Sequence, residues 1–156
     1  MPNPVKPTPE GFHSITASLI CEDAGRAIEF YKKVFGAQER MRMPTPEGKI
    51  GHAELKIGDS NIFVSDEFPR VGAHAPAVPG SIYLFLYVPD ADAVFNAPGA
   101  RADMPLTDQC WGDRYGKLTD PFRHQWGIAT HKEDVSPEEM DRRGKEFAKK
   151  MAAGQS

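Results

Sequence analysis

Residues 111–130 read Trp-Gly-Asp-Arg-Tyr-Gly-Lys-Leu-Thr-Asp-Pro-Phe-Arg-His-Gln-Trp-Gly-Ile-Ala-Thr, and this stretch decides the fold. Two segments with β character, Arg114–Thr119 and His124–Thr130, flank an Asp120-Pro121 pair. β-Branched and aromatic residues favour strands, and Asp followed by Pro is typical of a chain reversal. The pattern predicts a β-hairpin. Its aromatic and basic side chains suit a wall of a small-molecule pocket and a tryptophan-rich core equally well.

The same order of elements occurs twice along the chain. In each half we predict a strand, then a helix, then three further strands, from the spacing of the apolar residues. Asp23 and Asp90 are placed to cap the two helices, and Gly36 and Gly99 occupy equivalent positions after them. The predicted strands are 14–20, 37–43, 50–57 and 61–66 in the first half, and 81–88, 103–106, 114–119 and 124–130 in the second half.

We therefore predict an α+β fold with two βαβββ modules and a C-terminal helix. The last helix is expected because Ser136 suits an N-cap, Pro137 suits the first helical position, and Glu139 completes a capping box. A segment rich in Pro, Gly and Ala separates the modules. The predicted segments are an extended arm at 1–11, the first module at 12–67, a linker at 68–80, the second module at 81–133 and the helical region at 134–156.

The composition is that of an ordinary globular protein. The chain has 156 residues, of which 40% are hydrophobic and 26% charged, with a net charge of −3. No basic cluster suggests a nucleic-acid partner, and no apolar run approaches the ~18 residues that a membrane span needs. The first ten residues lack the apolar core of a signal peptide, so we expect a cytoplasmic protein. Cys21 and Cys110 are expected to be free, buried thiols.

Several motifs resemble the vicinal oxygen chelate superfamily, which contains glyoxalases, bleomycin-resistance proteins and extradiol dioxygenases. The chain is most similar to the PhnB-like branch of this superfamily, for which the Trp-Gly-Asp-Arg-Tyr-Gly motif is the more specific one. The likeness covers residues 14–133. The matching motifs are Ala-Ile-Glu-Phe-Tyr-Lys-Lys-Val-Phe-Gly-Ala at 27–37, Gly-His-Ala-Glu-Leu at 51–55, Leu-Phe-Leu-Tyr-Val at 84–88, Trp-Gly-Asp-Arg-Tyr-Gly at 111–116 and Asp-Pro-Phe-Arg-His-Gln-Trp at 120–126.

The resemblance implies that each module forms a curled mixed sheet around a concave cavity, and that the protein is a homodimer. It also implies a divalent metal held by His, Gln or Glu side chains from the strands. The three matching positions of this sequence hold Thr16, Tyr83 and Gly127. None of these is a strong ligand for zinc, nickel or manganese. We therefore predict no metal at these positions and no cofactor, which disfavours metal-dependent glyoxalase or dioxygenase activity.

Alternation along the strands selects the candidate site residues. His52 and Glu54 share one face of a strand, where they are candidates for an acid–base pair, for ligands of a displaced metal, or for hydrogen bonding within the sheet. Arg114 is expected to bind an anionic group of a ligand or to pair with Asp113 or Asp120. The predicted ligand-binding residues are Thr16, His52, Glu54, Tyr83, Phe85, Trp111, Arg114 and Trp126, with Tyr87 as further stacking surface.

Three functions are compatible with these residues. The first is a PhnB-like protein that binds a small aromatic or amphipathic molecule in a cavity without the usual metal ligands. The alternative is a lyase, isomerase or transferase that uses His52 and Glu54, with or without a divalent metal at a shifted site. The third is a structural or regulatory homodimer whose cavity has lost its function. Whether the protein is an enzyme stays open at this point.

Overall fold

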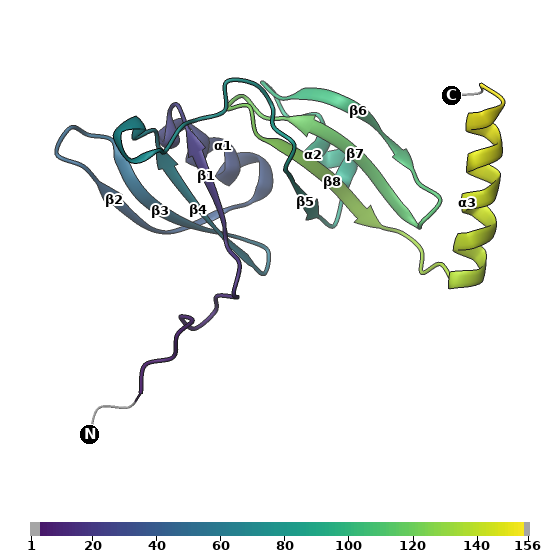
Figure 1. Cartoon of the computed structure of the whole chain (residues 1–156), viewed down its shortest axis with the longest axis horizontal. Helices are drawn as coiled ribbons and strands as arrows, with labels where there is room; N and C mark the ends of the chain where they lie inside the picture. The colour runs from purple at the N-terminus through teal and green to yellow at the C-terminus, as the bar shows by residue number, and fades with distance from the viewer. Residues whose placement is uncertain (1–3, 155–156) are drawn as a thin grey trace. The chain divides into compact units, whose positions relative to one another are not determined.

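The chain forms two compact units that divide after Val78 (Figure 1). The computed structural model describes residues 4–154. The predicted arm falls partly outside this range, and residues 4–11 contain neither helix nor strand. The division lies inside the segment rich in Pro, Gly and Ala. No helix within residues 4–154 combines the length and apolarity needed to cross a membrane.

The first unit contains a four-stranded mixed sheet with the strand order β1-β4-β3-β2. Strand β1 runs parallel to β4, and the other neighbours are antiparallel. A short 3-10 helix, Pro69–Val71, follows the sheet. The elements are β1 (Ala17–Cys21), α1 (Ala24–Phe35), β2 (Gln38–Pro44), β3 (Ile50–Ile57) and β4 (Ser60–Asp66).

The second unit repeats this arrangement with the strand order β5-β8-β7-β6. Again the first strand runs parallel to the last one, and the remaining pairs are antiparallel. The elements are β5 (Tyr83–Tyr87), α2 (Ala91–Phe95), β6 (Arg101–Asp108), β7 (Asp113–Thr119), β8 (Gln125–His131) and the C-terminal helix α3 (Pro137–Ala152). The predicted α+β fold, with two βαβββ sheets and a final helix, is confirmed.

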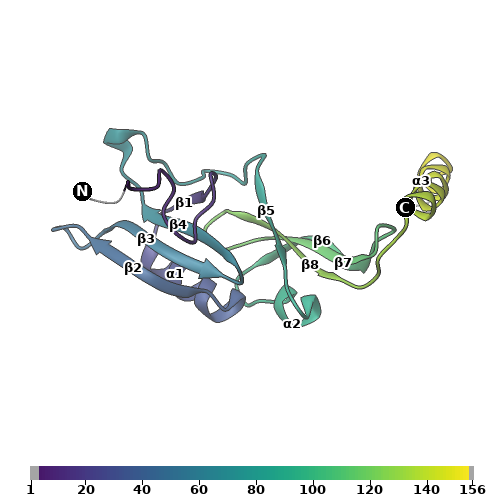
Figure 2. The same ribbon diagram turned by 90° about the horizontal axis from the view of Figure 1, so that it is seen from below.

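Each sheet packs its own helix against one face, α1 on the first sheet and α2 on the second (Figure 2). In the first unit the alternate residues that face α1 form the core. They are fully or almost fully buried, and Cys21 is among them. Cys110 is only half-buried, and neither cysteine takes part in a disulfide within residues 4–154. Core residues of this unit include Leu19, Ala27, Ile28, Tyr31, Ala53, Leu55 and Val64.

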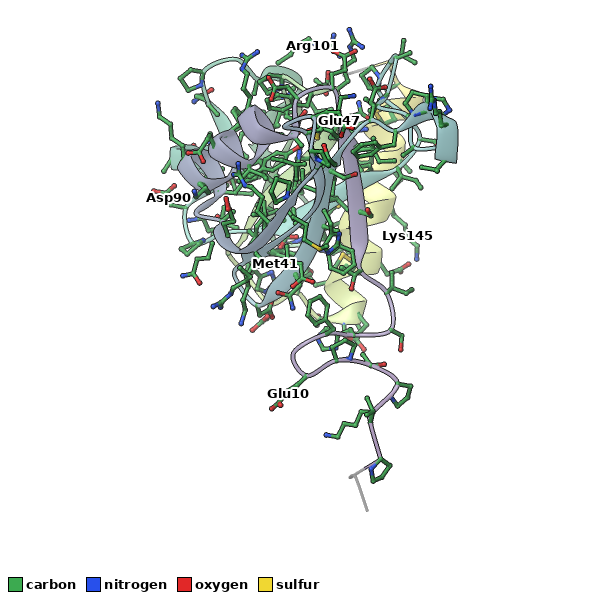
Figure 3. The ribbon with its side chains drawn as sticks, turned by 90° about the vertical axis from the view of Figure 1, so that its left-hand side faces the viewer. Glu10, Met41, Glu47, Asp90, Arg101 and Lys145 are labelled. Atoms are coloured by element: carbon green, nitrogen blue, oxygen red, sulfur yellow. The ribbon has the colours of Figure 1, made fainter. Side chains whose placement is uncertain are left out.

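The two helices are fixed to their sheets in the same way. In the first unit the backbone N–H of Ala24 donates to Asp66 Oδ1 at 2.8 Å. In the second unit the N–H of Ala91 donates to Thr130 Oγ1, also at 2.8 Å. Both acceptors are buried residues near the end of the last strand of their sheet. Asp90, labelled in Figure 3, caps α2 in addition. Each anchor satisfies one N–H group that a helix N-terminus otherwise leaves without a partner.

The hairpin predicted at residues 111–130 is present as β7 and β8, which pair antiparallel from Asp113 and His131 to Thr119 and Gln125. Its turn is held by the Asp120 carboxylate, which accepts backbone hydrogen bonds at 2.8 and 3.0 Å within the loop. Arg123 has a φ of 68°, so a non-glycine residue occupies a left-handed position here.

Candidate functional site

Five aromatic side chains gather on one face of the second sheet. The opposite face carries α2, whose Phe95 ring lies so close to Gly116 that a Cβ there would be 2.6 Å from it. On the open face, alternate residues of β5 project their rings beside one from β7 and one from the turn before it. We call this set, Tyr83, Phe85, Tyr87, Trp111 and Tyr115, the aromatic wall.

The rings of the aromatic wall pack against one another across the middle strand β8. Phe85 and Tyr115 stack with an interplanar angle of 4° and centroids 5.1 Å apart. Tyr87 lies 5.0 Å from Phe85, and Trp111 lies 5.9 Å from Tyr115, between ring centroids. These strands flank β8, where Gly127 leaves the space that the rings occupy. A Cβ at Gly127 would lie 2.9 Å from Tyr115 Cε2 and 3.0 Å from Phe85 Cδ2.

The aromatic wall remains accessible on its outer side. Within the chain, Tyr83 and Phe85 are each 40% exposed, Tyr87 is 59% exposed and Trp111 is 37% exposed, whereas Tyr115 is buried beneath them. Exposed rings that touch one another form a contiguous apolar patch, and such patches on protein surfaces are typical of binding sites. The arrangement offers stacking surface for a planar molecule.

Asp113 holds the edge of the aromatic wall in place. Its buried carboxylate accepts hydrogen bonds from Tyr87 Oη and Trp111 Nε1, each at 2.9 Å, and contacts His131 Nδ1 at 2.7 Å. Burial opposes the negative charge, but the hydrogen bonds from these side chains outweigh it and lower the pKa of Asp113. Ionised Asp113 therefore fixes two of the five rings.

Other groups on this face also have shifted pKa values. The pKa of His131 is raised by its hydrogen bonds with Asp134 and Asp113, both at 2.7 Å. Burial and a hydrogen bond with Tyr83 raise the pKa of Tyr115 to about 12, so this phenol stays neutral. The rings of the aromatic wall thus lie beside a hydrogen-bonded row of three side chains, Asp113, His131 and Asp134.

Lys117 also lies on the open face. Its ammonium nitrogen lies 4.5 Å from the centroid of the Tyr83 ring, which is cation–π geometry. Neither Lys117 nor Asp113 nor Tyr115 was selected by the sequence analysis. The same strand alternation that was applied to β5 and β8 would have found all three, since they are alternate residues of β7.

Trp126 does not belong to the aromatic wall, so its prediction as stacking surface is wrong. The side chain is 2% exposed, and its Nε1 donates to Asp120 Oδ2 at 2.9 Å. Trp126 alternates with Gly127 along β8 and therefore faces the other side of the sheet, where the core lies. Its role is to bind the hairpin turn to that core.

Arg114 pairs with carboxylates other than the two that were expected. Its guanidinium binds both oxygens of Asp92 on α2, at 2.7 and 2.9 Å, and Asp108 on β6 at 3.2 Å. Hydrogen bonds from Arg114 lower the pKa of Asp92. Pairing with Asp113 or Asp120 is therefore wrong. A hollow of about 530 Å³ lies beside this cluster, lined by Asp92, Asp108, Gln109, Gly112, Asp113, Arg114, Lys132 and Glu133.

The remaining predicted site residues lie in the first unit. His52 Nε2 is 3.4 Å from Glu54 Oε1, and the His52 ring lies 4.7 Å from the Phe63 ring between centroids. Thr16 is half-buried and immediately precedes β1. Met41, labelled in Figure 3, is paired in register with Glu54 on the neighbouring strand β2. The long His52–Glu54 contact agrees with hydrogen bonding within the sheet.

The positions that correspond to superfamily metal ligands do not fit a divalent cation. Gly127 has no side chain, and the rings of Phe85 and Tyr115 fill the space in which one would grow. The phenol of Tyr83 is engaged with Tyr115 and with Lys117. Within residues 4–154, no three His, Cys, Asp or Glu side chains are grouped so that they could hold a metal ion. The side chains at these positions therefore support no metal-dependent step.

Comparison with known proteins places the chain in a family. The model of the Glyoxalase/Bleomycin resistance protein/Dioxygenase superfamily matches residues 11–128. Uncharacterized protein Rv0887c of Mycobacterium tuberculosis is 36% identical over 135 residues, covering 81% of this chain and 79% of that protein.

Two solved structures are similar in fold. Protein PA1353 from Pseudomonas aeruginosa aligns with a TM-score of 0.67 and 25% identity, over 78% of this chain and 100% of the other. A PhnB protein from Bacillus cereus aligns with a TM-score of 0.63 and 21% identity, over 76% of this chain and 99% of the other. On the extent of the family match, the chain belongs to the Glyoxalase/Bleomycin resistance protein/Dioxygenase superfamily.

Proposed function

We propose that the chain is a PhnB-like superfamily member that binds a small planar molecule against the aromatic wall, without a metal at the superfamily's usual positions. The observation that carries this proposal is the set of touching, accessible rings on the open face of the second sheet. Sequestration of a metabolite or drug needs only such a surface. Stacking on an aromatic ring contributes about 1 kcal/mol beyond the area that it buries.

The ring positions are held before any ligand arrives. Asp113 fixes Tyr87 and Trp111 through its carboxylate, and Phe85 stacks on buried Tyr115. A ligand then pays little conformational entropy to order these side chains. This preorganisation supports binding over an accidental exposure of the rings.

The test is calorimetric titration of the full chain with naphthoate and with the corresponding amide, two planar probes of equal size. We expect both to bind, and Phe85→Ala to weaken both by about tenfold because it removes one ring of the stacked pair. Phe63→Ala is the matched control, since Phe63 is a half-buried ring on the first sheet that contacts His52 instead. It should leave both affinities unchanged. Binding that is absent, or equally strong in Phe85→Ala, contradicts the proposal.

A second candidate function, an acid–base enzyme, is supported by the contact between His52 and Glu54. A carboxylate beside an imidazole can orient it for proton transfer. Elemental analysis and thermal melting with nickel, zinc and manganese separate the two candidates. A stoichiometric metal that is lost in His52→Gln would favour an enzyme with a metal at a shifted site.

A further inference from the structure

One charged side chain beside the aromatic wall, that of Lys117, has no oppositely charged partner among the described residues. Lys117 is half-buried on β7, in register with Gly127 of β8, and so stands next to the stacked rings of Phe85 and Tyr115. Within residues 4–154 its ammonium group makes no hydrogen bond and no ion pair with an acidic side chain. An ammonium has three donors, and here its partner is the face of the Tyr83 ring alone.

The acidic side chains of this face already have hydrogen-bond or ion-pair partners. Asp113 accepts from three side chains. Asp103 accepts from Thr119 and pairs with Arg101. The basic His131 is paired with carboxylates on both ring nitrogens. Among the residues described here, Lys117 is therefore a charged group beside the stacking surface that has no acidic side chain as a partner.

We infer that the ligand is a planar anion, an aryl carboxylate or an acid of similar shape, whose ring stacks on Phe85 while Lys117 binds its acidic group. This inference rests on the proposed binding function and adds the charge of the ligand to it. Lys117 is the residue that determines specificity. A cationic ligand stacked on Phe85 is disfavoured because it would lie beside the ammonium group of Lys117, which repels it.

The inference is tested with three probes of one shape and different charge: naphthoate, its neutral amide, and naphthylmethylammonium. In calorimetric titrations of the full chain we expect naphthoate to bind about tenfold more tightly than the amide, which corresponds to one charge-assisted hydrogen bond. Added salt should reduce this preference, since the pair is partly exposed to solvent. The ammonium probe should bind most weakly.

Variants at Lys117 separate charge recognition from stacking. Lys117→Met keeps the length of the side chain and should remove the preference for naphthoate while leaving the amide's affinity unchanged. Lys117→Arg should restore the preference. Lys56→Met is the matched control, because it changes the net charge by the same amount from a half-buried lysine on the first sheet. This control should bind all three probes like the unaltered chain.

The possible failures are distinguishable. Equal affinity for the three probes, or tightest binding of the ammonium probe, overturns the inference about charge and leaves the binding function in place. A preference for naphthoate that survives in Lys117→Met overturns the role of Lys117. If none of the probes binds because a second copy of the chain covers the aromatic wall, the proposed function and this inference both fall.

Discussion

Residues 111–116 show how one short motif serves both faces of a sheet. Its alternate members point to opposite sides, as strand geometry requires. Gly112 has a φ of 101°, and a Cβ there would collide with the carbonyl oxygen of Glu133. Toward the open face lie Asp113 and Tyr115, and toward α2 lie Arg114 and Gly116. The motif therefore combines a tight backbone contact, an anchor for two rings and the packing of a helix.

The raised pKa of His131 makes the stability of the second unit depend on pH. Its pKa is raised by Asp134 and Asp113, so its contribution to stability is fully present below the unfolded pKa of about 6.5 and is lost as pH rises through the folded pKa. Asp113, whose pKa is lowered, loses its own contribution only as pH falls well below about 4. We expect His131→Gln to cost more unfolding free energy at about pH 5.5 than at about pH 8.5.

Urea unfolding of both proteins at the two pH values measures this difference. Asp134→Asn should remove part of the same pH dependence, because Asp134 makes the larger contribution to the raised pKa. His13→Gln is the control, since His13 is exposed and has no carboxylate partner among the described residues. A cost of His131→Gln that is equal at both pH values would rule out the charged pair as a source of stability.

For single residues, the sequence predicts the face of the sheet on which a side chain lies better than it predicts which side chains that residue contacts. Alternation on β8 already assigns Trp126 to the side opposite Gly127, so its selection as stacking surface was avoidable. Strand alternation does not predict the ion-pair partners of Arg114. Asp92 lies on a helix and Asp108 on a neighbouring strand, and their approach depends on a register that local patterns do not encode. Neighbours in sequence, such as Asp113, point away from Arg114.

Among the elements, each of the helices α1 and α2 has its N-terminus anchored by one buried side chain of its sheet. Thr130 Oγ1 accepts from the N–H of Ala91 and donates to the carbonyl of Val88, both at 2.8 Å. Thr130→Val keeps the shape and leaves both backbone groups without this partner. We expect a loss of about 1–3 kcal/mol in the unfolding free energy, measured by urea denaturation of the full chain.

Thr107→Val is the matched control for this substitution. Thr107 is exposed, and within residues 4–154 its hydroxyl accepts only from the Gln109 side chain, at 2.9 Å. Its replacement should change the unfolding free energy by no more than about 0.5 kcal/mol. Similar losses in the two variants would show that the β-branched valine, rather than the missing anchor of α2, determines the result.

The order and type of the elements followed from the sequence, whereas several of their ends did not. Helix α1 and the β7–β8 hairpin followed from spacing, caps and turn residues. Strand β1 starts at Ala17 instead of residue 14, because its pairing with β4 begins at Ala17 and Ile62. Strand β6 extends over Arg101–Asp108, beyond the predicted 103–106, since pairing with β7 continues through two irregularities in register. Pairing between distant strands sets these ends.

For the whole molecule, the two units share a topology but differ in the chemistry of their open faces. The first sheet presents His52 and Glu54 beside Phe63, and the second presents the aromatic wall. Both units anchor their helix on a buried side chain near the end of the last strand. The open faces can differ because side chains there are free of the packing that constrains the core. The open faces are therefore where the two units differ in the side chains available for binding.

We predict that the protein is a homodimer, as its family resemblance implies. In each unit a helix covers one face of the sheet, and accessible apolar side chains remain elsewhere, including Met43 at 54% and Ile82 at 82% exposure. Burying such surface stabilises an assembly by about 25 cal/mol per Å². Sedimentation velocity at micromolar concentration should give twice the mass of one chain.

Naphthoate should leave that mass unchanged, because the dimer contact is expected to spare the aromatic wall. A protein that sediments only as a monomer would contradict the prediction, and a dimer that naphthoate dissociates would place the contact on the wall itself.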